Sequence, residues 1–107
     1  MGYEYEFRID DAATLARALT SAETFAAARL GPRSDLEGVR SYSIAPTAPD
    51  GREGALQFCT THALLSVASR HELRSPLVKM VLETLESLGF EPYEEGDPTP
   101  TRYDEIG

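Results

Sequence analysis

Hydrophobic and charged residues alternate strictly over residues 3–10. Four apolar side chains share one side of this segment and four charged ones share the other; the apolar ones are Tyr3, Tyr5, Phe7 and Ile9. This period of two predicts a strand with one face packed on a core. Residues 39–45 (VRSYSIA) and 55–59 (ALQFC) predict two further strands, separated by a turn rich in proline, aspartate and glycine.

Residues 12–30 instead repeat apolar positions every three or four residues, which is typical of an amphipathic helix. Asp11 is a candidate N-cap, and Gly31-Pro32 is a stop signal. Thr20-Ser21 could divide this helix, but the apolar spacing continues in phase across it. The pattern favours one long helix or a kinked pair with the same buried face.

A second helix is predicted over residues 76–88, with Ser75 as N-cap, proline at the first helical position and a stop at Gly89. Residues 90–94 (FEPYE) predict a short edge strand, where a proline is tolerated because its missing N–H can face outward. Residues 62–69 suit a strand or a helix, and we favour a strand. Residues 31–38 (GPRSDLEG) are interpreted as a polar linker.

This order of elements predicts an α+β open-faced sandwich, with a mostly antiparallel sheet of four or five strands and two helices on one face. Two strands between the helices would make it ferredoxin-like, and three would make an extended variant. We expect one domain over residues 1–93 and a flexible acidic tail over residues 94–107, which lack periodicity. The predicted core contains Tyr3, Tyr5, Phe7, Ile9, Leu15, Leu19, Leu56, Phe58, Val81, Leu85 and Leu88.

The composition agrees with one folded domain, because 41% of the 107 residues are hydrophobic and 26% are charged. No apolar run approaches the roughly 20 residues that span a bilayer, and the first residues lack the features of a secretion signal. A single cysteine is consistent with a reducing compartment. We therefore expect a soluble, cytoplasmic protein that does not bind membranes.

The net charge of −8 is unevenly distributed along the chain. Ten acidic and nine basic residues lie between Met1 and Leu82, whereas eight acidic residues and only Arg102 follow from Glu83 onward. This acidic quarter would repel a phosphate backbone, and no basic stripe with interleaved aromatic residues compensates for it. Nucleic acid is therefore not an expected partner.

The segment Cys59-Thr60-Thr61-His62 is the one that most resembles a chemical site. A strand continuing through the threonines would point Cys59 and His62 to opposite faces, and a helix capped by Thr61 would also separate them. A tight turn at Thr60-Thr61 would make them cross-strand neighbours, but such turns favour positive φ, which is costly for β-branched threonine. We expect Cys59 to be structural and a poor nucleophile.

No other pattern indicates catalysis or metal binding. His71 lies in a polar segment (SRHELRSP), which lacks the second histidine of the zinc-protease helix motif. The glycines are too scattered to form a phosphate-binding loop. We predict no catalytic residue, no metal and no cofactor, and an enzyme is not the favoured class.

The remaining candidates are two surfaces. The first is acidic, with aromatic side chains that suit a basic partner, and it comprises Glu83, Glu86, Glu91, Tyr93, Glu94, Glu95 and Asp97. The second is the sheet face away from the helices, expected to carry Glu4, Glu6, Arg8 and Gln57, with either Ser41 and Ser43 or Arg40 and Tyr42.

We therefore expect a small non-enzymatic interaction module that binds a basic protein partner through its acidic C-terminal surface. The chain is similar to bacterial immunity proteins in size and charge only, since no motif is shared. The alternative is a ferredoxin-like ligand-binding or small catalytic domain that forms a homodimer through its open sheet face, with Cys59, His62 or His71 in a cleft.

Overall fold

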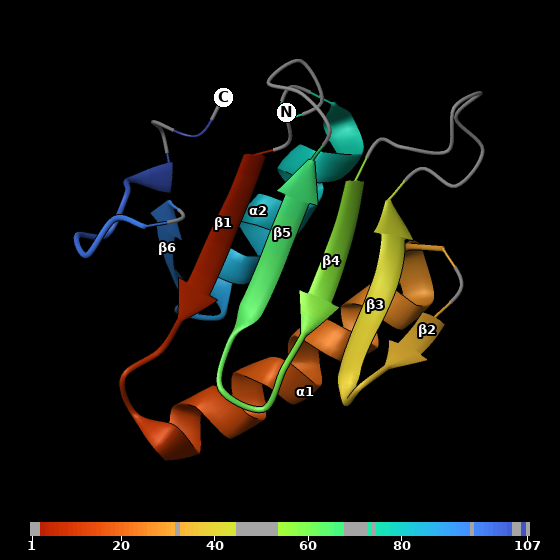
Figure 1. Ribbon diagram of the computed structural model, residues 1–107, viewed down its shortest axis with the longest axis horizontal. Coiled ribbons are helices and arrows are strands. Elements are labelled where there is room, and N and C mark those ends of the chain that lie inside the picture. The colour runs from red at the N-terminus through yellow and green to blue at the C-terminus, as the bar shows by residue number, and fades with distance from the viewer. Residues whose placement is uncertain are drawn as a thin grey trace.

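The computed structural model describes residues 3–31, 33–44, 54–67, 73, 75–94, 96–103 and 106, which form two helices and six strands (Figure 1). In chain order the elements are β1 (Tyr3–Arg8), α1 (Ala12–Arg29), β2 (Arg33–Leu36), β3 (Val39–Ile44), β4 (Gly54–Phe58), β5 (Ala63–Val67), α2 (Pro76–Ser87) and β6 (Glu91–Glu94). The strands make one sheet in the order β2-β3-β4-β5-β1-β6, and every neighbouring pair is antiparallel.

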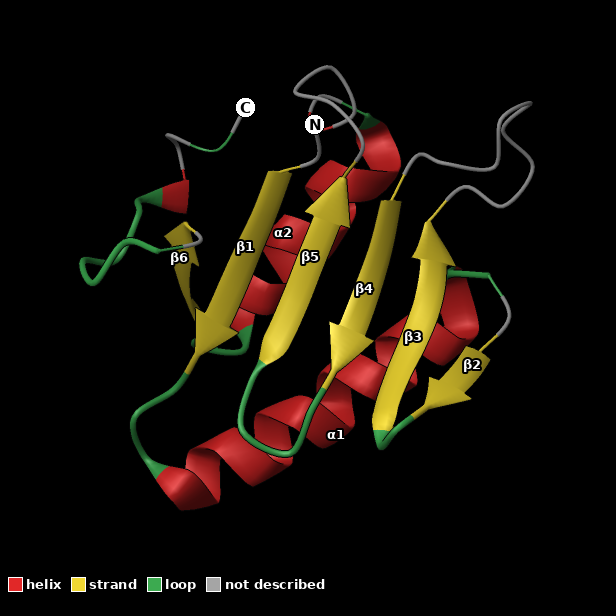
Figure 2. Ribbon diagram, in the orientation of Figure 1, coloured by secondary structure: helices red, strands yellow, loops and turns green. Residues whose placement is uncertain are grey.

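Both helices lie on the same side of the sheet, and the opposite face is left uncovered by them (Figure 2). The α+β class, the antiparallel sheet and its two helices are therefore confirmed. The predicted number of four or five strands is wrong, because the sheet has six. The ferredoxin-like arrangement stays a prediction.

The additional strand is β2, which occupies the segment interpreted from sequence as a linker. It pairs with β3 through a tight turn at Glu37 and Gly38, whose φ angles are 52° and 79°. All four residues of β2 are exposed at the edge of the sheet. An edge strand of this kind buries no apolar face, so its sequence lacks the alternation by which strands are recognised.

The register of β1 agrees with the sequence pattern. Tyr5 and Phe7 are buried, whereas Glu4 and Glu6, which alternate with them along the strand, lie on the other side. Tyr3 is the exception to the predicted core, because its side chain is 39% exposed at the first position of the strand. The other predicted core residues are buried or pack against the core, and they are Leu19, Leu56, Phe58, Val81 and Leu85, with Ile9, Leu15 and Leu88 at its margin.

Local capping contacts fix where the helices begin and end. Asp11 accepts a hydrogen bond from the N–H of Thr14 (2.9 Å), and Ser75 accepts one from the N–H of Val78 (3.1 Å). Helix α1 continues through residues 20–21 as one helix. Gly89 follows α2 with a φ of 96°, a conformation that glycine adopts without strain.

Residues 63–67 form a strand, as we expected. Alternate side chains of this strand, β5, are buried in the core.

The segment after β6 lies along the outer side of β6 (Figure 1). Thr101 N–H donates to Pro92 O (2.7 Å), Tyr103 Oη donates to Phe90 O (2.7 Å), and Ile106 is only 8% exposed. The proposed boundary between residues 93 and 94 stays a prediction.

Neither helix among the described residues is long and apolar enough to cross a membrane. A cytoplasmic location stays a prediction.

Candidate functional site

The acidic C-terminal surface is assembled from three consecutive parts of the fold. Glu83 and Glu86 are exposed on the last two turns of α2, Glu91 and Glu94 are exposed at the two ends of β6, and Asp97 is exposed just beyond it. Glu95, which belongs to the same prediction, lies outside the described residues. The described ion pairs involve other carboxylates, on β1, α1 and β2.

The partly buried phenol of Tyr103 connects two of these parts. Burial raises the pKa of Tyr103 well above its ordinary value, and the negative charges of Glu86 and Glu91 raise it further. Because both carboxylates act on one hydroxyl, the end of α2 and the start of β6 contribute to the same region of surface. This region has a negative field that a basic side chain would feel.

Tyr93 is less available than the sequence suggested. The guanidinium of Arg8 lies over its ring, with 4.6 Å between Cζ and the ring centroid. Arg8 also donates to Glu6 Oε2 (2.8 Å), and this hydrogen bond is the main cause that lowers the pKa of Glu6. Tyr93 therefore joins the open sheet face to the acidic surface, with one ring face already covered.

The Cys59–His62 segment is the tight turn that we disfavoured, and the objection from threonine geometry was wrong. Phe58 pairs with Ala63, and Cys59 N–H donates to His62 O (3.0 Å). Neither Thr60 nor Thr61 is among the described residues that have a positive φ. This turn therefore avoids the strain that the prediction assumed.

Among the described residues, however, no hydrogen bond or ion pair links the side chains of Cys59 and His62. His62 Nδ1 lies 2.9 Å from Thr61 Oγ1 and 3.6 Å from Glu6 Oε1. Within the described ranges, no three His, Cys, Asp or Glu side chains are grouped to hold a metal. His71 lies outside the described residues.

The open sheet face carries Glu4, Glu6, Arg8, Ser41, Ser43 and Gln57, which selects one of the two registers left open by the sequence. The other register is excluded because Tyr42 is 2% exposed and lies on the helix side, in line with Leu56 of β4. Arg40, two residues earlier on β3, therefore also faces α1.

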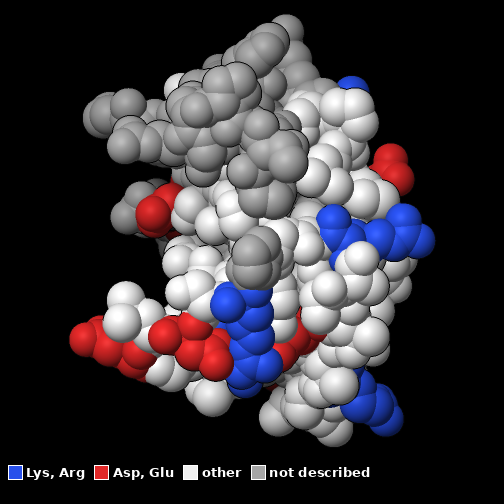
Figure 3. All heavy atoms as spheres, turned by 90° about the vertical axis from the view of Figure 1, so that its right-hand side faces the viewer, with Lys and Arg blue, Asp and Glu red and all other residues white. Residues whose placement is uncertain are grey.

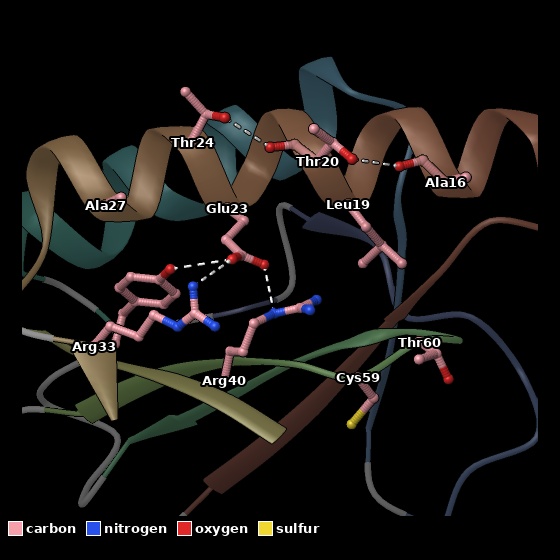
Figure 4. A pocket seen from close by; sticks show the side chains of 11 residues that line it. Ala16, Leu19, Thr20, Glu23, Thr24, Ala27, Arg33, Arg40, Cys59 and Thr60 are labelled. Atoms are coloured by element: carbon pink, nitrogen blue, oxygen red, sulfur yellow. Dashed lines mark hydrogen bonds and ion pairs between the residues drawn. The ribbon is translucent and has the colours of Figure 1, made fainter. Parts of the chain in front are cut away.

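Arg40 belongs to a pocket between α1 and the sheet that the sequence analysis missed (Figure 4). At its centre is Glu23 of α1. Glu23 Oε2 lies 2.6 Å from Arg40 Nε, and Glu23 Oε1 lies 3.5 Å from Arg33 Nη1 and accepts from Tyr42 Oη (3.3 Å). We call this the arginine pocket; its lining includes Ala16, Leu19, Glu23, Arg33, Arg40 and Thr60.

A sequence signal for this pocket existed. Tyr42 and Ile44 mark the inward side of β3, and by alternation Arg40 must share that side.

Around the exposed edge of the sheet, acidic and basic side chains lie next to one another rather than in separate patches (Figure 3). The charge pattern there is thus unlike that of the acidic C-terminal surface.

No protein-family model matches the chain, and no curated protein matches it significantly.

Proposed function

We propose that this protein is a small non-enzymatic interaction module that binds a basic protein partner through its acidic C-terminal surface. One observation carries the proposal: the end of α2, both ends of β6 and the following turn expose five carboxylates, none of them in a described ion pair. Exposed carboxylates without an ion pair among the described residues are suited to contact a cationic partner.

The distribution of charge along the chain supports the same interpretation. Seven of the eight net negative charges follow Leu82, so the field is directional. A directional field orients a basic partner during its approach and raises the association rate. Tyr93 at the margin of this surface supplies an aromatic group beside the carboxylates.

The test compares two triple variants that remove the same charge. The first, Glu86→Gln with Glu91→Gln and Glu94→Gln, neutralises the acidic surface. The control, Glu4→Gln with Asp10→Asn and Glu37→Gln, removes three exposed carboxylates elsewhere. After capture of a basic partner from the native cell extract, its association with each purified variant is timed in low salt.

The first variant should associate roughly tenfold more slowly than the wild type, whereas the control should stay close to it. Equal rates for the two variants would contradict the proposal, since net charge rather than this surface would then govern binding.

The alternative function is a ferredoxin-like ligand-binding or small catalytic domain that dimerises through the open sheet face. It is supported by the observation that both helices lie on the opposite side of the sheet (Figure 1). Analytical ultracentrifugation separates the two functions. A dimer that dissociates when Ser41 and Gln57 are replaced with lysine would favour the alternative.

A further inference from the structure

The guanidinium of Arg40 has N–H groups that make no hydrogen bond among the described residues. Its Nε is buried and lies 2.6 Å from Glu23 Oε2, although the direction of this contact does not meet hydrogen-bond geometry. Among the described residues, no hydrogen bond involves the two terminal nitrogens of Arg40. These nitrogens carry four N–H groups in a planar fork.

The free end of the fork points along the arginine pocket. In Figure 4 the guanidinium extends past Glu23 toward the part of the pocket that Leu19, Cys59 and Thr60 line. The pocket has a volume of about 550 Å³, which lies within the range of small-molecule sites. Ala16 and Leu19 give this part an apolar wall from α1.

The other polar groups of the pocket are largely occupied. Arg33 makes a bidentate pair with Asp35: its Nε donates to Oδ1 (2.7 Å) and its Nη2 donates to Oδ2 (3.0 Å). Thr20 Oγ1 donates to Ala16 O, and Thr24 Oγ1 donates to Thr20 O. A ligand would therefore find its strongest donors on Arg40.

The charge of the lining limits what that ligand can be. Arg33 is paired with Asp35, and Arg40 lies beside Glu23, so the two guanidiniums and the two carboxylates balance in charge. A ligand with one negative charge can accept hydrogen bonds from the terminal nitrogens of Arg40, whereas a dianion would be repelled more strongly by Glu23 and Asp35. The planar fork matches a carboxylate with two parallel hydrogen bonds.

From this geometry we propose that the arginine pocket binds a small organic monocarboxylate, with its carboxylate on the terminal nitrogens of Arg40 and its apolar part against Ala16 and Leu19. This site is separate from the acidic C-terminal surface and does not depend on the proposed function. Glu23 acts as an internal competitor, because it already holds part of the positive charge.

The test is a titration of the isotopically labelled full-length protein with hexanoate, at constant ionic strength, followed by the amide shifts of the NMR spectrum. Hexanoate should cause saturable shifts around Leu19, Arg40 and Thr60. Hexanamide, which has the same chain without the charge, and inorganic phosphate should bind more weakly. Equal binding of hexanoate and hexanamide, or tighter binding of phosphate, would overturn the proposal.

Two substitutions in the pocket should act in opposite directions. Arg40→Gln should raise the dissociation constant for hexanoate roughly tenfold or more, because it removes the charged donors. Glu23→Gln should lower it, because it removes the competing carboxylate. Arg17→Gln, which removes an exposed arginine of α1 outside the pocket, should leave it unchanged.

If Arg40→Gln does not fold, Arg40→Lys serves instead, since lysine keeps a charge beside Glu23 without the planar fork. Affinity that is unchanged in the folded Arg40 variant, or weakened by Glu23→Gln, would overturn the assignment.

Discussion

Replacing Ile106 with alanine should destabilise the fold by about 2–3 kcal/mol. Ile106 is 8% exposed and belongs to the hydrophobic core, although it is the penultimate residue of the chain. The substitution removes three carbons, and each buried methylene contributes about 0.8 kcal/mol. This loss lies in the lower part of the range for large-to-small core substitutions, and a cavity left by the missing atoms would add to it.

The measurement is equilibrium unfolding in urea, followed by circular dichroism, with thermal unfolding as a second readout. For a domain of this size, a loss of 2–3 kcal/mol corresponds to a fall of roughly 10–20 °C in melting temperature. Leu36→Ala is the matched control, because this aliphatic side chain is 72% exposed on β2. It should change stability by less than about 0.5 kcal/mol.

A result for Ile106→Ala that matches the Leu36→Ala control would refute this reasoning. The side chain of Ile106 would then contribute nothing measurable to stability, and the division into a domain over residues 1–93 and a flexible tail would be supported. The predicted loss would instead show that the folded unit extends to Ile106.

Substitutions at three further positions test individual parts of the fold. Gly54→Ala should cost at least about 1 kcal/mol in urea unfolding, because the added Cβ would lie 2.6 Å from Ser66 O of the paired strand. Ser75→Ala should cost about 1 kcal/mol by removing the cap of α2, and Ser75→Gly should recover part of that loss. Tyr103→Phe should flatten the decline of stability at alkaline pH. Burial raises the pKa of Tyr103 above its ordinary value of 10.0, so the unfolded chain releases this proton first and stability falls as pH rises beyond that value.

The helices could be predicted from sequence because their boundaries depend on local contacts. Asp11 and Ser75 cap α1 and α2 through residues three positions away, so the required information lies within one turn. The inward side of β1 was equally clear, since its apolar residues alternate with charged ones.

The parts that could not be predicted depend on contacts between elements that are distant in the sequence. β2 exposes all four of its residues and becomes a strand only because it pairs with β3. The turn at Thr60-Thr61 is set by the β4–β5 register, in which Phe58 pairs with Ala63. The arginine pocket joins Glu23 of α1 to Arg40 of β3, and only the packing of the helix on the sheet brings them together.

The central claim, that the acidic C-terminal surface binds a basic partner, is tested most directly by the salt dependence of the association rate. The rate for the captured partner is measured from low ionic strength up to 0.15 M, where screening shortens to about 8 Å. The wild type should slow steeply as salt rises, and the variant with Glu86, Glu91 and Glu94 neutralised should be slower at low salt with a shallower dependence. Identical salt dependence in the two proteins would contradict the claim.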